Sequence, residues 1–410
     1  MDSSALLRIW SSITDELALH QDRAPGDFRG QVVNPISGMI YARDTAFSAK
    51  VFATEYRRTR EEKWLLRSKG ALDSLSKVDV YSGIDYPIWT RYGWDYEKGS
   101  LAPTGMSLDA IWDTKSLLGL KDEGKEQWNR LFRYLEGCLV GPGLFAHALM
   151  QPRTDPPAIQ NTTAIALYLL EYAASKVGDA NDLVLKERDL ALLSLSRGQR
   201  IDGFWPYIYP GPMQQFFFRF PAIRPFIRRL PIVRRYFYKA GDRSVFFGDV
   251  VHHCLVFYYL VKSILLREPN FPYVAVVNRG WEWIYKHLVE TSYGGLRVDF
   301  DWEPKPLVPR YCNFRETSTY FLILATLLLL ARMGVIGDEF RSIASGLLIH
   351  IENSLLENEG TFPGIKPYEG PVAVLRNILP RVGESVAWKG SCLCQLVLAK
   401  SSLGVFTATD

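Results

Sequence analysis

Helical periodicity runs along most of the 410-residue chain, and strand-like alternation is rare. The helices come in pairs, in which one member is apolar almost all round and the other carries charges at helical spacing. An all-apolar helix is normally buried, whereas a striped helix lies at a surface. The apolar helices are predicted to begin near Asp44, Ser107, Asn161, Asp249, Glu316 and Ser385. Their amphipathic partners are predicted at residues 62–78, 124–137, 183–198, 273–290 and 338–356.

The last apolar helix has no amphipathic partner after residue 400, but an N-terminal helix at about 4–20 can supply one. Inner helices that alternate with outer helices in this way predict an all-α fold, an (α/α)6 barrel, with residues 1–410 as one domain. No hairpin can bury its inner face alone, so neighbouring hairpins must stack. An open helical solenoid is the alternative, although it normally has a more regular period and shorter loops.

Gly-aromatic turns follow several outer helices, as in GPGLFAHAL at 141–149 and DGFWPYIYP at 202–210. Two further examples are GGLRVDFDWEP at 294–304 and EGTFPGIKP at 359–367. In a closed ring such loops converge on one rim, above the N-terminal ends of the inner helices. The sequence therefore predicts a functional cleft at that rim.

Two segments carry a resemblance to known families. Residues 43–75, RDTAFSAKVFATEYRRTREEKWLLRSKGALDSL, resemble the opening hairpin of sugar-processing six-hairpin toroids, including unsaturated glucuronyl hydrolases, in which an Asp stands at the start of an inner helix. The segment QRIDGFWPY, at 199–207, matches the Q-x3-G-x-W core of the QW motif of isoprenoid cyclases and is also similar to a turn in sugar-processing toroids. The resemblance implies an enzyme that hydrolyses, eliminates or epimerises at a sugar.

Carboxylates near the predicted starts of inner helices are candidate acid/base groups. Asp44 opens the first inner helix, where partial burial among aromatic residues suits proton transfer, although a simple helix cap is the structural alternative. Asp109 and Asp113 are four residues apart and share a helix face, so they would combine with Asp44 in a two-carboxylate site or would instead lie at an exposed helix start.

Later inner helices supply further candidates. His252 and His253 are adjacent on an apolar helix, and at most one of them needs to face a cavity, since neighbouring helical residues point about 100° apart. A core histidine is the structural alternative. Glu316 occupies the same place in the fifth inner helix as Asp44 in the first, and Arg315 beside it would bind the carboxylate of an acidic sugar.

Aromatic side chains at loops and helix starts are candidate platforms for sugar rings, and they would equally stabilise a carbocation. Packing at the rim is the structural alternative. The predicted substrate-binding residues are Trp205, Tyr207, Trp302, Arg315, Tyr320 and Trp388.

Basic charge is concentrated in one segment, Gln214–Lys239, which holds seven Arg/Lys, eight aromatic residues and no acidic residue, in a chain whose net charge is +4. Its prolines rule out one long helix. We predict an insertion at 211–248 that anchors the protein at an anionic membrane or forms a lid. The run of basic and aromatic residues is also compatible with nucleic-acid binding. Its dense Phe, Ile and Leu residues favour lipid. The predicted membrane residues are Phe217, Phe218, Arg224, Arg228, Arg229, Arg234 and Arg235.

Other function classes are disfavoured. The N-terminus does not resemble a signal peptide, and five cysteines in such a chain favour a cytoplasmic location, with peripheral membrane attachment as the alternative. Phosphate-binding and nucleophile-elbow motifs are missing, no C-x-x-C pair occurs, and we expect neither a cofactor nor a metal. The predicted partner is a glycan or lipid-linked substrate. Two alternatives remain, an isoprenoid cyclase, whose D-x-D-D acid the chain lacks, and a catalytically inert scaffold.

Overall fold

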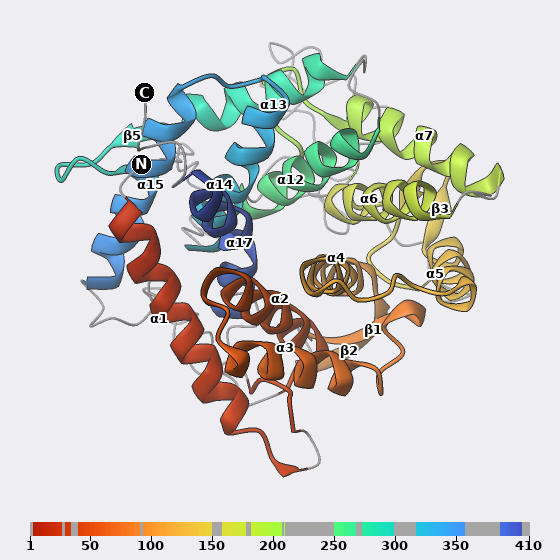
Figure 1. The fold of residues 1–410 in the computed structure, drawn as a ribbon. Helices are drawn as coiled ribbons and strands as arrows, with labels where there is room; N and C mark the ends of the chain where they lie inside the picture. Colours follow the sequence, from red (N-terminus) through yellow and green to blue (C-terminus); the bar gives the residue numbers. More distant parts are fainter. Residues whose placement is uncertain are drawn as a thin grey trace. The chain divides into compact units, whose positions relative to one another are not determined.

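The computed structural model describes residues 3–26, 29–33, 40–90, 93–149, 158–177, 182–206, 209, 250–267, 273–298, 317–356 and 386–403. These residues divide into two compact units (Figure 1). The first unit comprises Met1–Tyr134, Val289–Arg297 and Arg315–Asp410, and the second comprises Leu135–Leu288 and Val298–Phe314.

The first unit is built on inner helices that pack side by side, each against an outer helix. Helix α2 lies between α4 and α17, and α17 also packs on α14; the outer helices α3, α15 and α1 pack on α2, α14 and α17. The bounds are α1 (Ser3–Asp22), α2 (Ala42–Thr59), α3 (Glu62–Leu75), α4 (Leu101–Leu118), α14 (Thr317–Arg332), α15 (Glu339–Leu356) and α17 (Val386–Leu403), with a short 3-10 helix η2 (Val80–Ser82) before α4. Helix α5 (Lys125–Gly137) belongs to this unit up to Tyr134.

The hairpin of α2 and α3 shows why the sequence forms this pairing. Helix α2 is buried on nearly all sides, whereas α3 buries only a stripe that includes Trp64 and Leu75. The rings of Phe52 on α2 and Trp64 on α3 stack at 5.8 Å between centroids. Each such buried aromatic side chain stabilises the fold by roughly 1.5–3 kcal/mol. The helical stripe thus determines which face of the outer helix meets the inner one.

The second unit repeats this arrangement. Inner helices α6 (Gln160–Lys176) and α12 (Val250–Leu266) pack against each other, α7 (Asp182–Gly198) packs on α6, and α13 (Val274–Lys286) packs on α12. A network of charged side chains joins these helices: Arg267 at the end of α12 pairs with Glu171 on α6 and, at 2.8 Å, with Asp189 on α7. Burial raises the pKa of the Glu171 carboxyl, and the neighbouring guanidiniums of Arg267 and Arg188 oppose that rise.

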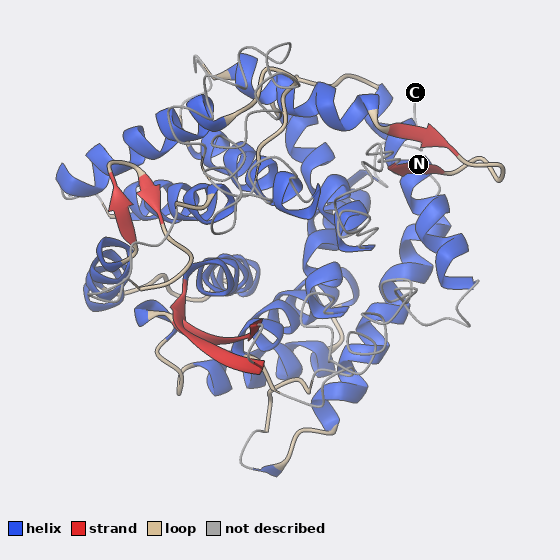
Figure 2. Cartoon of the chain, turned by 180° about the vertical axis from the view of Figure 1, so that it is seen from behind, coloured by secondary structure: helices blue, strands red, loops and turns tan. Residues whose placement is uncertain are grey.

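Three two-stranded antiparallel sheets occur in the described part of the chain (Figure 2). They are β1–β2 (Ile84–Thr90 and Gly93–Ser100), β3–β4 (Leu139–Gly141 and Leu144–Phe145) and β5–β6 (Leu288–Glu290 and Leu296–Val298). In the first, Ile84 pairs with Ser100 and Trp89 with Trp94, with a register shift between Ile84 and Tyr86. The turns at 141–149 and 294–304, predicted as loops, therefore contain strand residues.

The described helices begin within about three residues of the predicted starts, with one exception. Helix α4 begins at Leu101 and not near Ser107, so the predicted start was wrong. Pro103 does not prevent this earlier start, because it is the third helical residue and the first turn needs no backbone N–H donor. The insertion predicted at 211–248 lies outside the described residues, so the predicted domain organisation stays a prediction.

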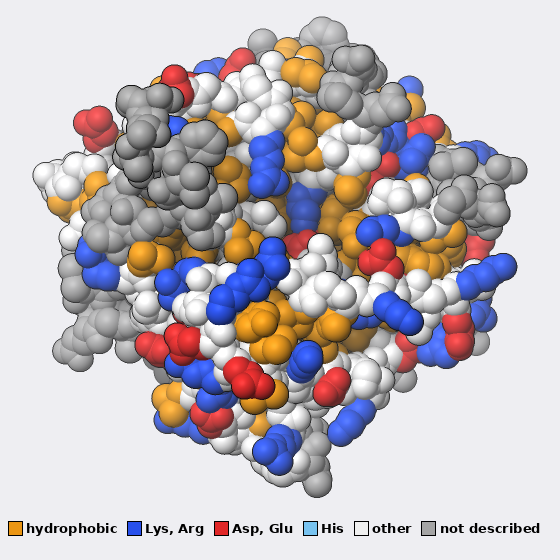
Figure 3. Space-filling model, in the orientation of Figure 1, with side chains coloured by type: hydrophobic (Ala, Val, Ile, Leu, Met, Phe, Trp, Pro, Cys, Tyr) orange, Lys and Arg blue, Asp and Glu red, His pale blue; other side chains and the backbone are white. Residues whose placement is uncertain are grey.

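Acidic and basic side chains are interspersed over the α1–α3 part of the surface drawn in Figure 3. Examples are the pairs Arg67–Asp22 at 2.8 Å and Lys63–Glu61 at 2.6 Å. Exposed pairs of this kind contribute little to stability. No helix in the described ranges is both long enough and apolar enough to cross a membrane.

Candidate active site

Asp44 is the third residue of α2 and is almost completely buried, with 1% of its surface exposed. The N-cap position belongs to Tyr41, so Asp44 does not cap the helix. The Ser48 hydroxyl donates a hydrogen bond to the Asp44 backbone carbonyl at 2.8 Å and does not contact the carboxylate through this bond. A buried carboxylate at this place is not explained by helix capping.

Arg43 lies beside Asp44, with 3.4 Å between its Nε and the Asp44 Oδ1. The same guanidinium lies 6.0 Å from the centre of the Phe47 ring, and Phe47 packs on Trp388 of α17 at 4.9 Å. We call Arg43, Asp44, Phe47 and Trp388 the α2 cluster. It combines a carboxylate, a guanidinium and two aromatic rings on adjacent inner helices.

Asp109 and Asp113 lie on α4, which packs on α2. The Asp113 carboxylate is 2.8 Å from the ammonium of Lys50, whose side chain is 2% exposed. Because Asp109 stands one turn before Asp113, it shares the helix face that meets α2. It is 3% exposed, and since α4 starts at Leu101 it lies in the third turn and not at an exposed helix start. The first unit therefore buries Asp44 and Asp109 and ties Asp113 to a lysine.

Lys50 is a residue that the sequence analysis missed. The signal was present, because Lys50 interrupts the apolar run AFSAKVFA on a helix predicted to be buried. Lys389 gives the same signal in VAWKGSCL on α17 and is 1% exposed. Charged residues are rarely fully buried unless they are paired, so each lysine indicated a partner on a neighbouring helix.

His253 and Trp205 belong to the core of the second unit. The His253 ring is fully buried, and its Nδ1 accepts a hydrogen bond from the Trp205 backbone N–H at 3.1 Å. Its Nε2 therefore carries the proton and lies toward the Gly280 backbone, without a regular hydrogen bond to any described residue. Phe204, at 5.0 Å, and Trp283, at 4.5 Å, pack on the ring.

Burial lowers the pKa of His253 to about 3, so the imidazole stays neutral. The Trp205 indole is also fully buried, and its N–H donates to the Leu195 carbonyl at 2.9 Å. Both residues thus hold the turn after α7 against α12 and α13, and we assign them structural roles. The neighbouring His252 is partly exposed on α12.

The remaining predicted residues divide into described and undescribed sets. Tyr320 is buried on α14 and meets the His350 ring edge-on at 4.8 Å. Four candidates for catalysis or substrate binding lie outside the described residues: Tyr207, Trp302, Arg315 and Glu316. The seven predicted membrane residues, Phe217, Phe218, Arg224, Arg228, Arg229, Arg234 and Arg235, also lie outside them. Among described residues, no three His, Cys, Asp or Glu side chains are grouped so as to hold a metal ion.

Sequence comparison finds no matching protein family and no similar curated protein. Comparison of structures finds an unsaturated glucuronyl hydrolase from Bacillus sp. GL1, responsible for the degradation of glycosaminoglycan, at 12% identity and a TM-score of 0.63, over 98% of this chain and 97% of that one. A D-mannose isomerase is similar at 14% identity and a TM-score of 0.57, over 97% and 98% of the chains. An α-1,6-mannanase of Salegentibacter sp. HEL1_6, in complex with α-1,6-mannotetrose, matches at 12% identity and a TM-score of 0.57, over 97% and 99%.

These similarities extend over nearly the whole chain and confirm the predicted all-α (α/α)6 fold. The isoprenoid-cyclase alternative gains no support from them. Its QW-like turn has a structural explanation, because the Gln199 side-chain amide donates to the carbonyls of Gly203 and Val276, both at 3.0 Å. The motif thus ties the turn to α13 in this protein.

Proposed function

We propose that this protein is a carbohydrate-active enzyme that acts on a glycan by general acid/base catalysis, with Asp44 as the principal proton-transfer group. The observation that carries the proposal is a buried, non-capping carboxylate at the start of an inner helix, in a fold shared with sugar-processing enzymes. The unsaturated glucuronyl hydrolase, the mannanase and the isomerase all have sugar substrates in their names.

Hydrolysis, elimination and epimerisation at a sugar share one requirement, a positioned group that moves a proton to or from oxygen or carbon. A carboxyl group shielded from water can perform this step, and such catalysis contributes about 10²–10⁴-fold in rate. In the proposed site, Asp44 exchanges the proton while Arg43 offsets its charge when it is ionised. Trp388 provides the aromatic surface for the sugar ring.

Asp109 is the proposed second carboxylate, because it is buried on the α4 face that meets α2. Asp113 is assigned a positioning role, since its charge is already neutralised by Lys50. From the sequence we retain Glu316 and His252 as further proton-transfer candidates. Arg315, Tyr207, Trp302 and Tyr320 are retained as candidates for substrate binding.

The test is turnover of a panel of oligosaccharides and lipid-linked glycans by the wild-type protein and by Asp44→Asn. We expect the variant to lose at least about 10²-fold in turnover, with thermal unfolding measured beside it to show that the variant is folded at the assay temperature. Asp73→Asn, a matched exchange at an exposed site on α3, should retain full activity. Undiminished turnover by Asp44→Asn would remove Asp44 from the mechanism, and a wild-type protein inert on every glycan would favour the scaffold alternative.

The finer form of the proposal is a lipid-linked glycan substrate met at an anionic membrane. It is supported by the composition of Gln214–Lys239, in which arginines alternate with bulky apolar residues. Flotation with phosphatidylserine vesicles tests it, and deletion of residues 214–239 should abolish binding. Equal flotation of the wild type and the deletion variant, or none by the wild type, would contradict membrane attachment.

A further inference from the structure

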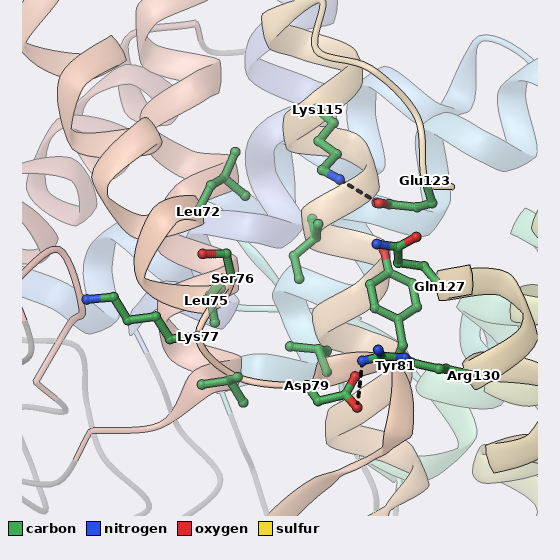
Figure 4. A pocket seen from close by; sticks show the side chains of 13 residues that line it. Leu72, Leu75, Ser76, Lys77, Asp79, Tyr81, Lys115, Glu123, Gln127 and Arg130 are labelled. Carbon is green, nitrogen blue, oxygen red and sulfur yellow. Dashed lines mark hydrogen bonds and ion pairs between the residues drawn. The ribbon is translucent and has the colours of Figure 1, made fainter. Parts of the chain in front are cut away.

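A second candidate binding site lies in the first unit, in a cavity of about 350 Å³ between the end of α3, η2, α4 and the start of α5 (Figure 4). Its α4 wall is formed by Ile111 and Lys115. Each stands two residues after a carboxylate that faces α2, Asp109 or Asp113, and two residues turn an α-helix by about 200°. The cavity is therefore on the opposite side of α4 from the Lys50–Asp113 pair and is separate from the α2 cluster.

Four of the five charged side chains that line this cavity form two ion pairs. Lys115 Nζ is 2.6 Å from Glu123 Oε2, and Arg130 is 3.2 Å from Asp79 (Figure 4). A third cation, Lys77, points away from the other labelled side chains. Because the two pairs are each neutral and Lys77 is exposed and points away, the cavity offers hydrogen-bonding groups without a strong net attraction for either a cation or an anion.

Glu123 has one carboxylate oxygen that no described residue satisfies. Its side chain is 6% exposed, and Lys115 takes Oε2, while the buried Oε1 has no hydrogen-bond partner. A buried carboxylate oxygen left unpaired costs stability, and hydrogen bonds to charged groups are stronger than neutral ones. Gln127, whose amide can both donate and accept, lies beside it in Figure 4. Glu123 Oε1 can therefore accept a hydrogen bond from a ligand in the cavity.

On the other side of the cavity, Leu72 and Leu75 of α3 present apolar side chains, while the Tyr81 ring lies on the side of Gln127 and Arg130 (Figure 4). A ligand that fits this cavity has hydroxyl groups on one edge and C–H groups on the other. The volume is at the small end of the range for ligand pockets, about 300–1,000 Å³, and accommodates one or two pyranose rings.

We propose that this cavity is a non-catalytic binding site for a neutral mono- or disaccharide unit, which donates a hydroxyl hydrogen bond to Glu123 Oε1. Only the choice of a glycan as ligand rests on the proposed function, whereas the preference for a neutral molecule that donates a hydrogen bond is argued from the paired ions and from Glu123 Oε1. The site would hold a part of a longer glycan away from the α2 cluster.

Saturation-transfer NMR and titration calorimetry with cellobiose, maltose and α-1,6-mannobiose test the proposal, with glucosamine and glucuronic acid as charged counterparts. We expect at least one neutral disaccharide to bind the wild type. Glu123→Ala should weaken its binding at least about tenfold, since a hydrogen bond to a charged group is lost. Ser76→Trp, which fills the cavity from an exposed position, should abolish it.

The matched control is Glu126→Gln, which removes an ion pair with the same Arg130 but does not line the cavity. It should bind as the wild type does. Ser76→Trp is a second, independent test in case Glu123→Ala does not fold. Thermal unfolding shows whether each variant is folded. The proposal is overturned if no neutral sugar binds, if only a charged sugar binds, or if Ser76→Trp binds normally.

The two proposals fail in different ways. Asp44→Asn should retain disaccharide binding at the cavity while it loses turnover. If the protein turns over a glycan but no sugar binds the cavity, this inference alone is refuted. If a disaccharide binds, Ser76→Trp abolishes that binding and no glycan is turned over, the catalytic proposal alone is refuted.

Discussion

The buried His253 gives the protein a predictable loss of stability in acid. Its folded-state pKa is about 3 against an ordinary value of 6.5, because burial disfavours the charged ring. Protonation would also remove the acceptor that Nδ1 offers to the Trp205 N–H, since both ring nitrogens of a charged imidazole are donors. A proton therefore binds the unfolded chain in preference to the folded one.

The sign and size follow from linkage. The folded pKa lies below the unfolded one, so the contribution of the neutral ring is complete above pH 6.5 and is lost as pH falls toward 3. The difference between 6.5 and about 3 corresponds to roughly 5 kcal/mol over the whole range. About 2 kcal/mol of this is lost between pH 7 and pH 5.

The perturbation is His253→Asn, measured by urea unfolding at pH 7 and pH 5. The Asn oxygen can take the place of Nδ1 as acceptor for Trp205, and the side chain does not titrate. We expect the free energy of unfolding of the wild type to fall by about 2 kcal/mol more than that of the variant. Equal losses in the wild type and His253→Asn would refute the reasoning.

Three further predictions concern the buried core. Lys50→Met should destabilise the fold by about 2–4 kcal/mol in urea unfolding, because Asp113 loses its partner, and Lys50→Met/Asp113→Leu should recover part of this; no recovery would contradict the pairing. Gly203→Ala should cost about 2 kcal/mol or more and lower the melting temperature, because Gly203 has φ of +94° and an added Cβ would meet the Arg279 carbonyl at 2.0 Å. Cys394, whose pKa burial raises to about 11, should resist iodoacetamide at pH 8 until the protein unfolds, as read by mass spectrometry; labelling in the native state would contradict its burial.

The helices could be predicted because their signals are local. The apolar stripe of α5, which buries Trp128, Leu131, Tyr134 and Leu135, repeats at helical spacing. It can be recognised without knowing which element packs against it. The β1–β2 hairpin was missed, although the run IDYPIWT is rich in aromatic and β-branched residues. Two strands are stable only when paired and packed, so their pattern is weaker than that of a long helix.

The sequence by itself therefore determined the order of inner and outer helices, and it singled out Asp44 as a carboxylate on a buried helix. Only the tertiary structure decided that Asp113 meets Lys50 and that His253 is a neutral core residue. The physical reason is that helical periodicity assigns a residue to a face, whereas its chemistry depends on which side chains of distant segments lie against that face. Burial and partnership, which distinguish a proton-transfer group from a structural one, arise from packing between helices.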